Sequence, residues 1–216
     1  MSVFTSRLIK LSAALLFAFA PSAQATPIHN NFGLSNPTAT ITFQEVVLPD
    51  QTELLNTYKA FGVVFGAGMR YSTLNFGIPN SSPNSAVNFT FPPPPPSVFV
   101  DPFEIFFVHP LTSAAMVVAT SVLAPPNTPN TKITALLGGN VVESVAVTTS
   151  QSGTVNFFGF TGIVFDEIQI SDVDSGIVVD NIQLGDIAGI PEPASIVLLS
   201  SGLVGLVGAA RRRRRR

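Results

Sequence analysis

The segment TATITFQEVV, residues 38–47, shows the pattern on which the fold prediction rests. Apolar and polar residues alternate there, so that in an extended chain Ile41 and Phe43 point to one side while Thr40 and Thr42 point to the other. A period of two is typical of a β-strand that buries one face. The segment therefore predicts a strand, and similar runs recur along the chain.

These β-rich runs, separated by Gly, Pro, Asn and Ser, number about ten and lie at a spacing near that of sandwich folds. They predict one all-β domain, an antiparallel β-sandwich over residues 37–187, which a polar entry segment, residues 26–36, precedes. A helical period occurs only at residues 51–58. The 18 phenylalanines, against two tyrosines and no tryptophan, suit the core of such a domain. The other runs are residues 61–65, 86–91, 103–108, 115–121, 132–137, 141–149, 154–160, 163–171 and 176–184.

Charge is distributed unevenly along the 216 residues, whose formal net charge is −2. Between residues 26 and 190 only three basic residues stand against twelve acidic ones, a formal charge of −9, and most of the basic residues lie at the two ends. An acidic body argues against nucleic-acid binding, which needs clustered Lys and Arg. The absence of cysteine excludes a disulfide framework, a thiolate metal site and a cysteine nucleophile.

The N-terminal 25 residues have the features of a secretory signal peptide. Two basic residues precede the apolar segment of residues 11–20, which is too short to span a bilayer. Ala23 and Ala25 then provide the small residues that signal peptidase reads. We expect cleavage after Ala25, which makes Thr26 the first residue of the mature protein.

The C-terminus has three parts in order: the motif Pro191, Glu192 and Pro193, the apolar residues 194–210, and a run of arginines. The two prolines disfavour helix and leave an extended segment that a protease can read. Seventeen apolar residues would span about 26 Å as a helix, which predicts a minimal transmembrane helix. The basic run would stay in the cytoplasm and place the body outside. It consists of Arg211, Arg212, Arg213, Arg214, Arg215 and Arg216.

The sequence IPEPAS at residues 190–195, with the apolar segment and the arginines after it, resembles the PEP-CTERM sorting signal of Gram-negative bacteria. The resemblance covers residues 188–216. It implies that a membrane enzyme, exosortase, recognises the motif and removes the tail, and that the protein reaches the cell surface or the extracellular matrix. The alternative is an ordinary single-span tail anchor, which would not require the Pro-Glu-Pro motif.

The body also resembles ectodomains that often precede this signal, which are similar to jelly-roll modules of the carbohydrate-binding kind. The resemblance implies a jelly-roll-like sandwich. The segments that carry it are residues 41–46 (ITFQEV), 58–65 (YKAFGVVF), 106–116, 134–147, 158–160 (FGF), 165–168 (FDEI) and 179–182 (VDNI).

Such modules often bind a structural Ca²⁺ between their first and last strands. The carboxylates at matching places are Glu45 and Asp180. Because Ca²⁺ takes six to eight oxygen ligands, backbone carbonyls from loops would have to complete the shell. The alternative is that both residues are ordinary strand-end acids.

The sequence has few features of an enzyme. Its two histidines are His29 and His109, and no Gly-x-Ser-x-Gly, His-Glu-x-x-His, phosphate-loop or dinucleotide motif is present. Asp166 and Glu167 are adjacent in a strand, so their side chains face opposite sides. We therefore expect no catalytic residues and no enzymatic activity.

The leading hypothesis is an exported, non-catalytic protein of the cell surface or of an extracellular matrix such as an exopolysaccharide biofilm. The alternative is a secreted carbohydrate-binding module, and a secreted hydrolase is less favoured. The expected partners are signal peptidase, exosortase, the inner membrane (transiently, through the C-terminal helix) and extracellular polysaccharide. The protein would be membrane-anchored before processing and at the surface or in the matrix afterwards.

Overall fold

The computed structural model describes residues 25–90, 99–120, 128–172 and 175–188. The described chain is all-β and its strands pair antiparallel, as predicted. Most of the predicted signal peptide, together with the Pro-Glu-Pro motif, the apolar segment and the arginines, lies outside the described residues. Within the described ranges, no helix has the length and apolar character needed to cross a membrane.

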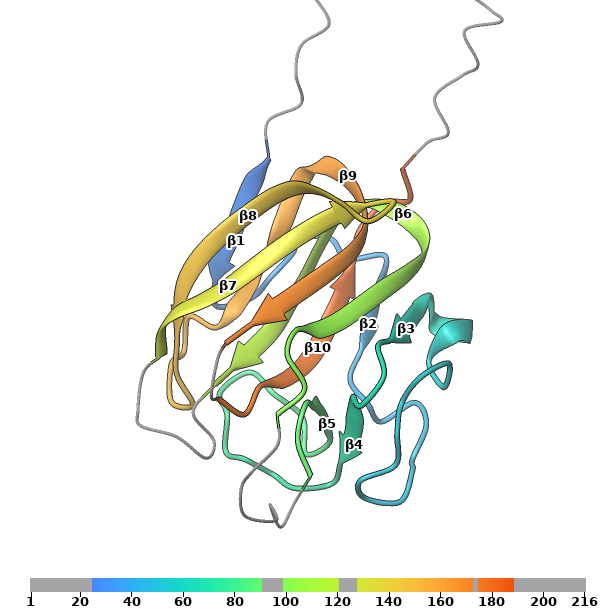
Figure 1. Cartoon of the computed structure of the whole chain (residues 1–216), viewed down its shortest axis with the longest axis vertical. Coiled ribbons are helices and arrows are strands. Elements are labelled where there is room, and N and C mark those ends of the chain that lie inside the picture. The colour runs from blue at the N-terminus through green and yellow to red at the C-terminus, as the bar shows by residue number, and fades with distance from the viewer. Residues whose placement is uncertain (1–24, 91–98, 121–127, 173–174, 189–216) are drawn as a thin grey trace, which may run out of the picture.

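All the strands of the described residues belong to one hydrogen-bonded sheet, with the order β4-β5-β10-β6-β9-β7-β8 (Figure 1). Three short strands join it at the sides: β1 pairs with β9, β2 with β10 and β3 with β6. The strands are β1 (Thr26–Asn30), β2 (Ala39–Ile41), β3 (Val63–Phe65), β4 (Arg70–Ser72), β5 (Ser85–Val87), β6 (Phe103–Ala119), β7 (Thr128–Leu137), β8 (Asn140–Thr149), β9 (Phe157–Ser171) and β10 (Val178–Leu184).

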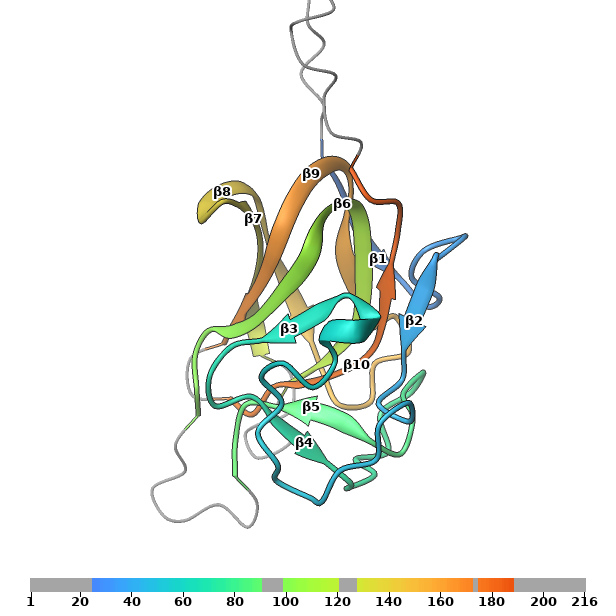
Figure 2. The same cartoon turned by 90° about the vertical axis from the view of Figure 1, so that its right-hand side faces the viewer.

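The two long strands β6 and β9 connect two halves of this sheet. The first part of β6 pairs with β3 and with the last part of β9, whereas the last part of β6 pairs with β10 and with the first part of β9. The β6–β9 register shifts on both sides of Leu111, next to Pro110, which has no amide hydrogen to donate. Gly162 of β9 has a positive φ of 82° at the same level. The sheet therefore bends here and turns around the core (Figure 2).

The main core lies between these two halves. Phe103 and Ile105 come from the first half and Phe160 and Val179 from the second, and all four belong to one buried cluster. A second, smaller cluster covers the opposite face of β10 and of the last part of β6. Because these segments are buried on both faces, they read as continuous apolar runs such as AAMVVA rather than as alternating patterns.

Three segments near the start of the described chain differ from the sequence-based expectation. In residues 38–47 only Ala39–Ile41 forms a strand, because Phe43 adopts a positive φ of 60° and the chain leaves the sheet. Residues 51–58 form turns instead of a helix and lead into a 3₁₀ turn, Lys59–Phe61. The expected polar entry segment contains β1. The jelly-roll arrangement of the strands remains a prediction.

Candidate functional site

Both ends of the described body lie at the same end of the sheet (Figure 1). Thr26, the expected mature N-terminus, is the first residue of β1 and pairs with Thr161 of β9. At the other end, the Ala188 amide donates a hydrogen bond to the Pro110 carbonyl at 2.8 Å. Cleavage after Ala25 would leave β1 intact, while Ala23 and the Pro-Glu-Pro motif lie outside the described residues. The cleavage position therefore remains a prediction.

The first candidate Ca²⁺ ligand, Asp180, is a fully buried residue of β10. Its carboxylate accepts hydrogen bonds from the Ser82 amide at 2.5 Å, the Ser82 hydroxyl at 2.9 Å and the Asn181 amide at 2.6 Å. Burial raises the pKa of Asp180 to about 7, although these hydrogen bonds act in the opposite direction. Asp180 therefore holds the loop between β4 and β5 against β10.

The second candidate ligand, Glu45, is exposed and lies on the other side of Thr42. Its Oε1 accepts hydrogen bonds from the Thr42 amide at 2.8 Å and the Thr42 hydroxyl at 2.9 Å. The Ser82 hydroxyl, which contacts Asp180, also donates to the Thr42 carbonyl at 2.8 Å. The structure thus connects the two acids through Thr42 and Ser82.

The donor set around Asp180 fits a cation poorly. Its carboxylate already faces two amide hydrogens and a hydroxyl, so a cation bound there would have to displace them. Within the described ranges, no group of three or more His, Cys, Asp or Glu residues could hold a metal ion. Bound Ca²⁺ therefore remains a prediction.

Sequence reasoning missed a cluster of polar residues on the outer face of the first half of the sheet. Gln169 lies opposite Glu104 in the β6–β9 register, and its Nε2 donates to Glu167 Oε1 at 2.6 Å and reaches Glu104 Oε1 at 3.5 Å. Burial raises the pKa of Glu167, with smaller contributions from Glu104 and Asp166. The available signal was the alternation in FEIF and DEIQI, which directs these polar residues away from the core.

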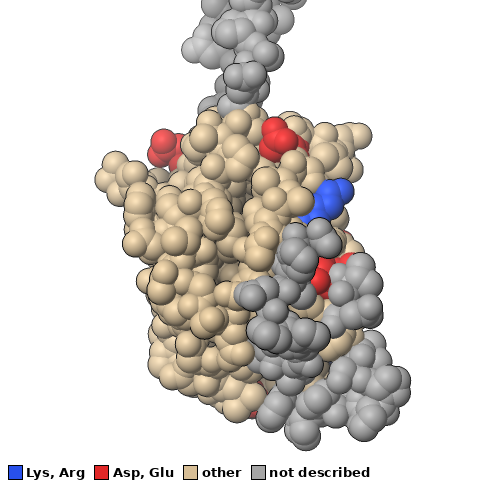
Figure 3. Space-filling model, turned by 90° about the vertical axis from the view of Figure 1, so that its left-hand side faces the viewer, with Lys and Arg blue, Asp and Glu red and all other residues tan. Residues whose placement is uncertain are grey.

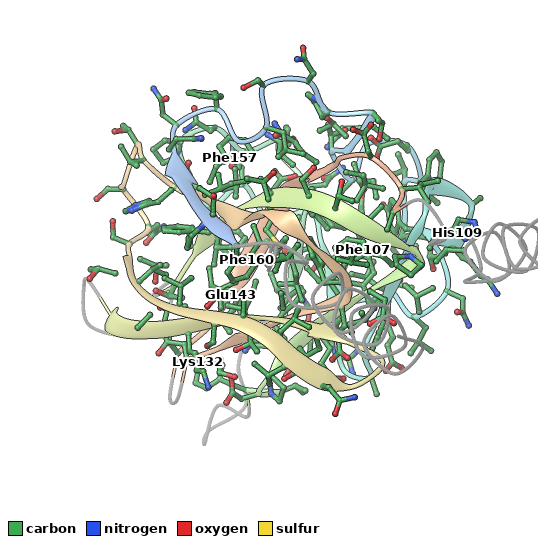
Figure 4. The ribbon with its side chains drawn as sticks, turned by 90° about the horizontal axis from the view of Figure 1, so that it is seen from above. Phe107, His109, Lys132, Glu143, Phe157 and Phe160 are labelled. Atoms are coloured by element: carbon green, nitrogen blue, oxygen red, sulfur yellow. The ribbon has the colours of Figure 1, made fainter. Side chains whose placement is uncertain are left out.

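The two histidines lie in different surroundings. The His29 ring stacks on Phe158, with ring centroids 4.7 Å apart. His109 is exposed at the margin of the molecule (Figure 4) and lines a cleft of about 370 Å³ together with Phe61 and Ile187. In the same view, Phe107 and Phe160 belong to the core between the two halves of the sheet.

A second cleft, of about 360 Å³, lies beside β1 and is more polar. Phe32 lines it and is 57% exposed, with Asn30, Ser113 and Asp186 among its neighbours. The two tyrosines, in contrast, are fully buried, and their hydroxyls donate to the carbonyls of Val46 and Phe43. Phe32 therefore has an aromatic ring that a ligand could contact from solvent, whereas the rings of the two tyrosines are inaccessible.

The charged side chains are few and scattered on the face shown in Figure 3, where broad uncharged areas separate them. The described residues on this face form no basic patch of the kind that binds nucleic acid. The main electrostatic property of the body is therefore its negative net charge.

In the sequence, the β-sheet domain is followed after a few residues by the Pro-Glu-Pro motif, the apolar segment and the arginines. This order is typical of proteins that are exported and then processed at the C-terminus. Residues 189–215 match the family described as the PEP-CTERM protein-sorting motif. The chain thus carries a PEP-CTERM sorting motif at its C-terminal end, and the motif indicates an exported, membrane-anchored protein that exosortase processes at the surface. Comparison with curated proteins and with solved structures gave no match.

Proposed function

We propose that the protein is a non-catalytic component of the cell surface or of an extracellular matrix, and that exosortase removes its C-terminal segment before it takes up this role. The sorting motif is the observation that carries the proposal. The short connection between body and motif supports it, because Pro191 follows only three positions after Ala188, which is hydrogen-bonded to the sheet. The body would therefore be delivered as a folded unit.

Intact mass and location of the protein, in cells with and without exosortase, test this proposal. We expect a mature form that starts at Thr26, ends between Pro191 and Ala194, and is found outside the cell. Deletion of exosortase, or Glu192→Ala in normal cells, should leave a membrane-bound form that retains Arg216. A matched variant in the body, Glu143→Ala, should be processed normally. A mass that retains Arg216 in cells containing exosortase would contradict the proposal.

Carbohydrate binding is the second candidate, and the cleft beside β1 favours it. Phe32 could stack on a sugar ring, while Ser113 and Asp186 could hydrogen-bond to its hydroxyls. Binding of the processed protein to a glycan array tests this function. Phe32→Ala should abolish the binding, whereas Phe61→Ala, which removes another exposed phenylalanine, should not. Equal binding by both variants would reject this cleft as the sugar site.

The absence of catalysis is also part of the proposal and requires its own test. Glu104 and Glu167 are the acids that a hydrolase could use, since they share Gln169 as a neighbour. We expect no turnover of polysaccharide or ester substrates by the processed protein. Turnover that is lost in Glu167→Gln would instead establish a hydrolase.

A further inference from the structure

Exposed apolar side chains gather at the end of the body from which both chain ends leave. Large hydrophobic residues exposed in the described chain gather at this end, and the five that lie around the bend of β6 and β9 and the β7–β8 turn are 37% to 63% exposed. We call this surface the apolar end. It consists of Val108, Leu137, Val141, Val164 and Ile187.

Contacts between distant parts of the chain bring these residues together near the bend of β6 and β9. Ile187 forms a β-bridge with Leu111, and Leu111 pairs with Phe165, the residue after Val164. Leu137 and Val141 lie on either side of the β7–β8 turn.

Asp166 of β9 holds the β7–β8 turn next to the bend of β9. The Gly138 amide donates to the Asp166 carboxylate oxygens at 3.0 and 3.1 Å, and Asp166 lies two positions after Val164. Figure 1 shows the bend of β9, the β7–β8 turn and the last described residues of the chain together at this end.

The position of the sorting motif keeps this end close to the membrane before processing. A chain spans at most about 3.6 Å per residue, so Pro191 can lie no more than about 11 Å from Ala188. The apolar segment begins at Ala194, directly after the motif. Because the connection to the anchor is so short, the part of the surface near Ala188 is the part that can face the lipid.

We propose that the apolar end rests on the lipid surface of the inner membrane while the C-terminal segment is attached. The inference depends on the proposed anchoring and goes beyond it by assigning an orientation to the body. Asp166 and Asp186 lie at this end, so apolar contact and not charge attraction would hold it there. The contact would be weak by itself and effective only because the anchor keeps the local concentration high. Removal of the anchor by exosortase would therefore end it.

The absence of tryptophan from the chain allows a direct test. The anchored form, purified from cells without exosortase, would carry a single Val141→Trp or Val164→Trp substitution and be reconstituted in phospholipid vesicles. Val47→Trp serves as the control, because Val47 is 77% exposed and belongs to the loop between β2 and β3. This loop pairs with Tyr71 of β4 through residues 51 and 52 and extends away from the end at which the chain ends leave (Figure 1). Circular dichroism checks that each variant is folded.

We expect fluorescence at positions 141 and 164 to shift to shorter wavelength and to be largely lost when the lipids carry brominated chains. Position 47 should show neither effect. Vesicle-bound protein with unquenched fluorescence at positions 141 and 164 would overturn the orientation while leaving the anchoring intact. Protection of these positions only when exosortase is also present would assign the apolar end to the enzyme and also overturn the proposal. Protein that does not float with the vesicles would overturn both the orientation and the anchoring.

Discussion

At the residue scale, the most unusual group in the structure is the buried carboxyl of Asp180. A strand residue in the middle of a sheet is usually apolar, since transfer of a charge from water into the interior is costly. Here the protein satisfies the carboxyl oxygens with Ser82 and Asn181, yet the pKa remains raised to about 7. The folded state therefore favours the neutral acid.

This raised pKa makes stability depend on pH. The folded protein retains a proton at Asp180 between about pH 4 and pH 7 that the unfolded chain has already lost. The contribution to stability is complete below about pH 4 and is lost as the pH rises to about 7, a difference of up to about 4 kcal/mol. We expect Asp180→Asn to remove most of this slope, as measured by denaturant unfolding across the pH range. Asp186→Asn, at an exposed position, should retain it.

The same residue decides whether Ca²⁺ contributes to the fold. A cation bound there would favour the ionised carboxylate, so any increase in Tm that Ca²⁺ causes through this residue would be largest at a pH above about 7. The increase should disappear in Asp180→Asn and become smaller in Glu45→Gln. A Tm that does not change with Ca²⁺ would establish the two acids as structural groups that act through Thr42 and Ser82.

At the scale of elements, the fold depends on the close pairing of β6 with β9. These are the two longest strands, and they belong to both halves of the sheet. Gly159 is central to their contact, because a side chain there would meet the backbone of β6. The absence of a Cβ at this position permits the strands to approach closely enough for Phe158 and Phe160 to enter the core.

Gly159→Ala should therefore be strongly destabilising. Its Cβ would lie 2.0 Å from the Ala114 carbonyl oxygen and 2.8 Å from the Ala115 Cα, so the two strands would have to separate. We expect a loss of roughly 3 kcal/mol in the free energy of unfolding, measured with denaturant. The control is Gly77→Ala, where nothing lies within 4 Å and only the positive φ opposes the change, at a cost of about 1 kcal/mol. Similar losses in both variants would contradict the proposed role of the close approach.

The sequence predicts strands well where local pattern decides the structure. The run at residues 141–149 agrees with β8, Asn140–Thr149, and the run at 176–184 with β10, Val178–Leu184. The runs at 103–108 and 115–121 are one strand, because the chain bends and changes register at Pro110 instead of turning. Strand β1 (TPIHN) carries little apolar signal and forms through backbone pairing with β9.

The candidate site was predictable only in part. The residue types of Glu45 and Asp180 were visible, but their connection through Thr42 and Ser82 depends on loops that come together only in the fold. The irregular register between Asp180 and Gln183, which shapes this part of β10, has no local signature that distinguishes it from an ordinary strand. Long-range packing of this kind is not encoded in a pattern of period two.

At the scale of the whole molecule, net charge determines which extracellular polymers the processed protein can approach without electrostatic repulsion. The body has a formal charge of −9, and removal of the arginines takes away the main concentration of positive charge. Anionic polysaccharide would repel such a body unless divalent cations bridge them.

We therefore expect divalent cations to control association with anionic polysaccharide. Cosedimentation of the processed protein with such a polymer should increase with added Mg²⁺ or Ca²⁺ and decrease with a chelator, whereas a neutral polymer should show no such dependence. Binding to the anionic polymer that is unaffected by chelation would indicate a direct recognition site in place of cation bridging.

The position of β10 in the sheet also has a consequence for the timing of folding during export. It is the last strand of the described residues, yet β2, β5 and β6 all pair with it, so the sheet cannot close until residue 184 has crossed the membrane. Pro191 follows seven positions later. The final folding step and the arrival of the sorting motif at the membrane therefore nearly coincide, and a chain that stalls before β10 would present unpaired strand edges in place of a finished body.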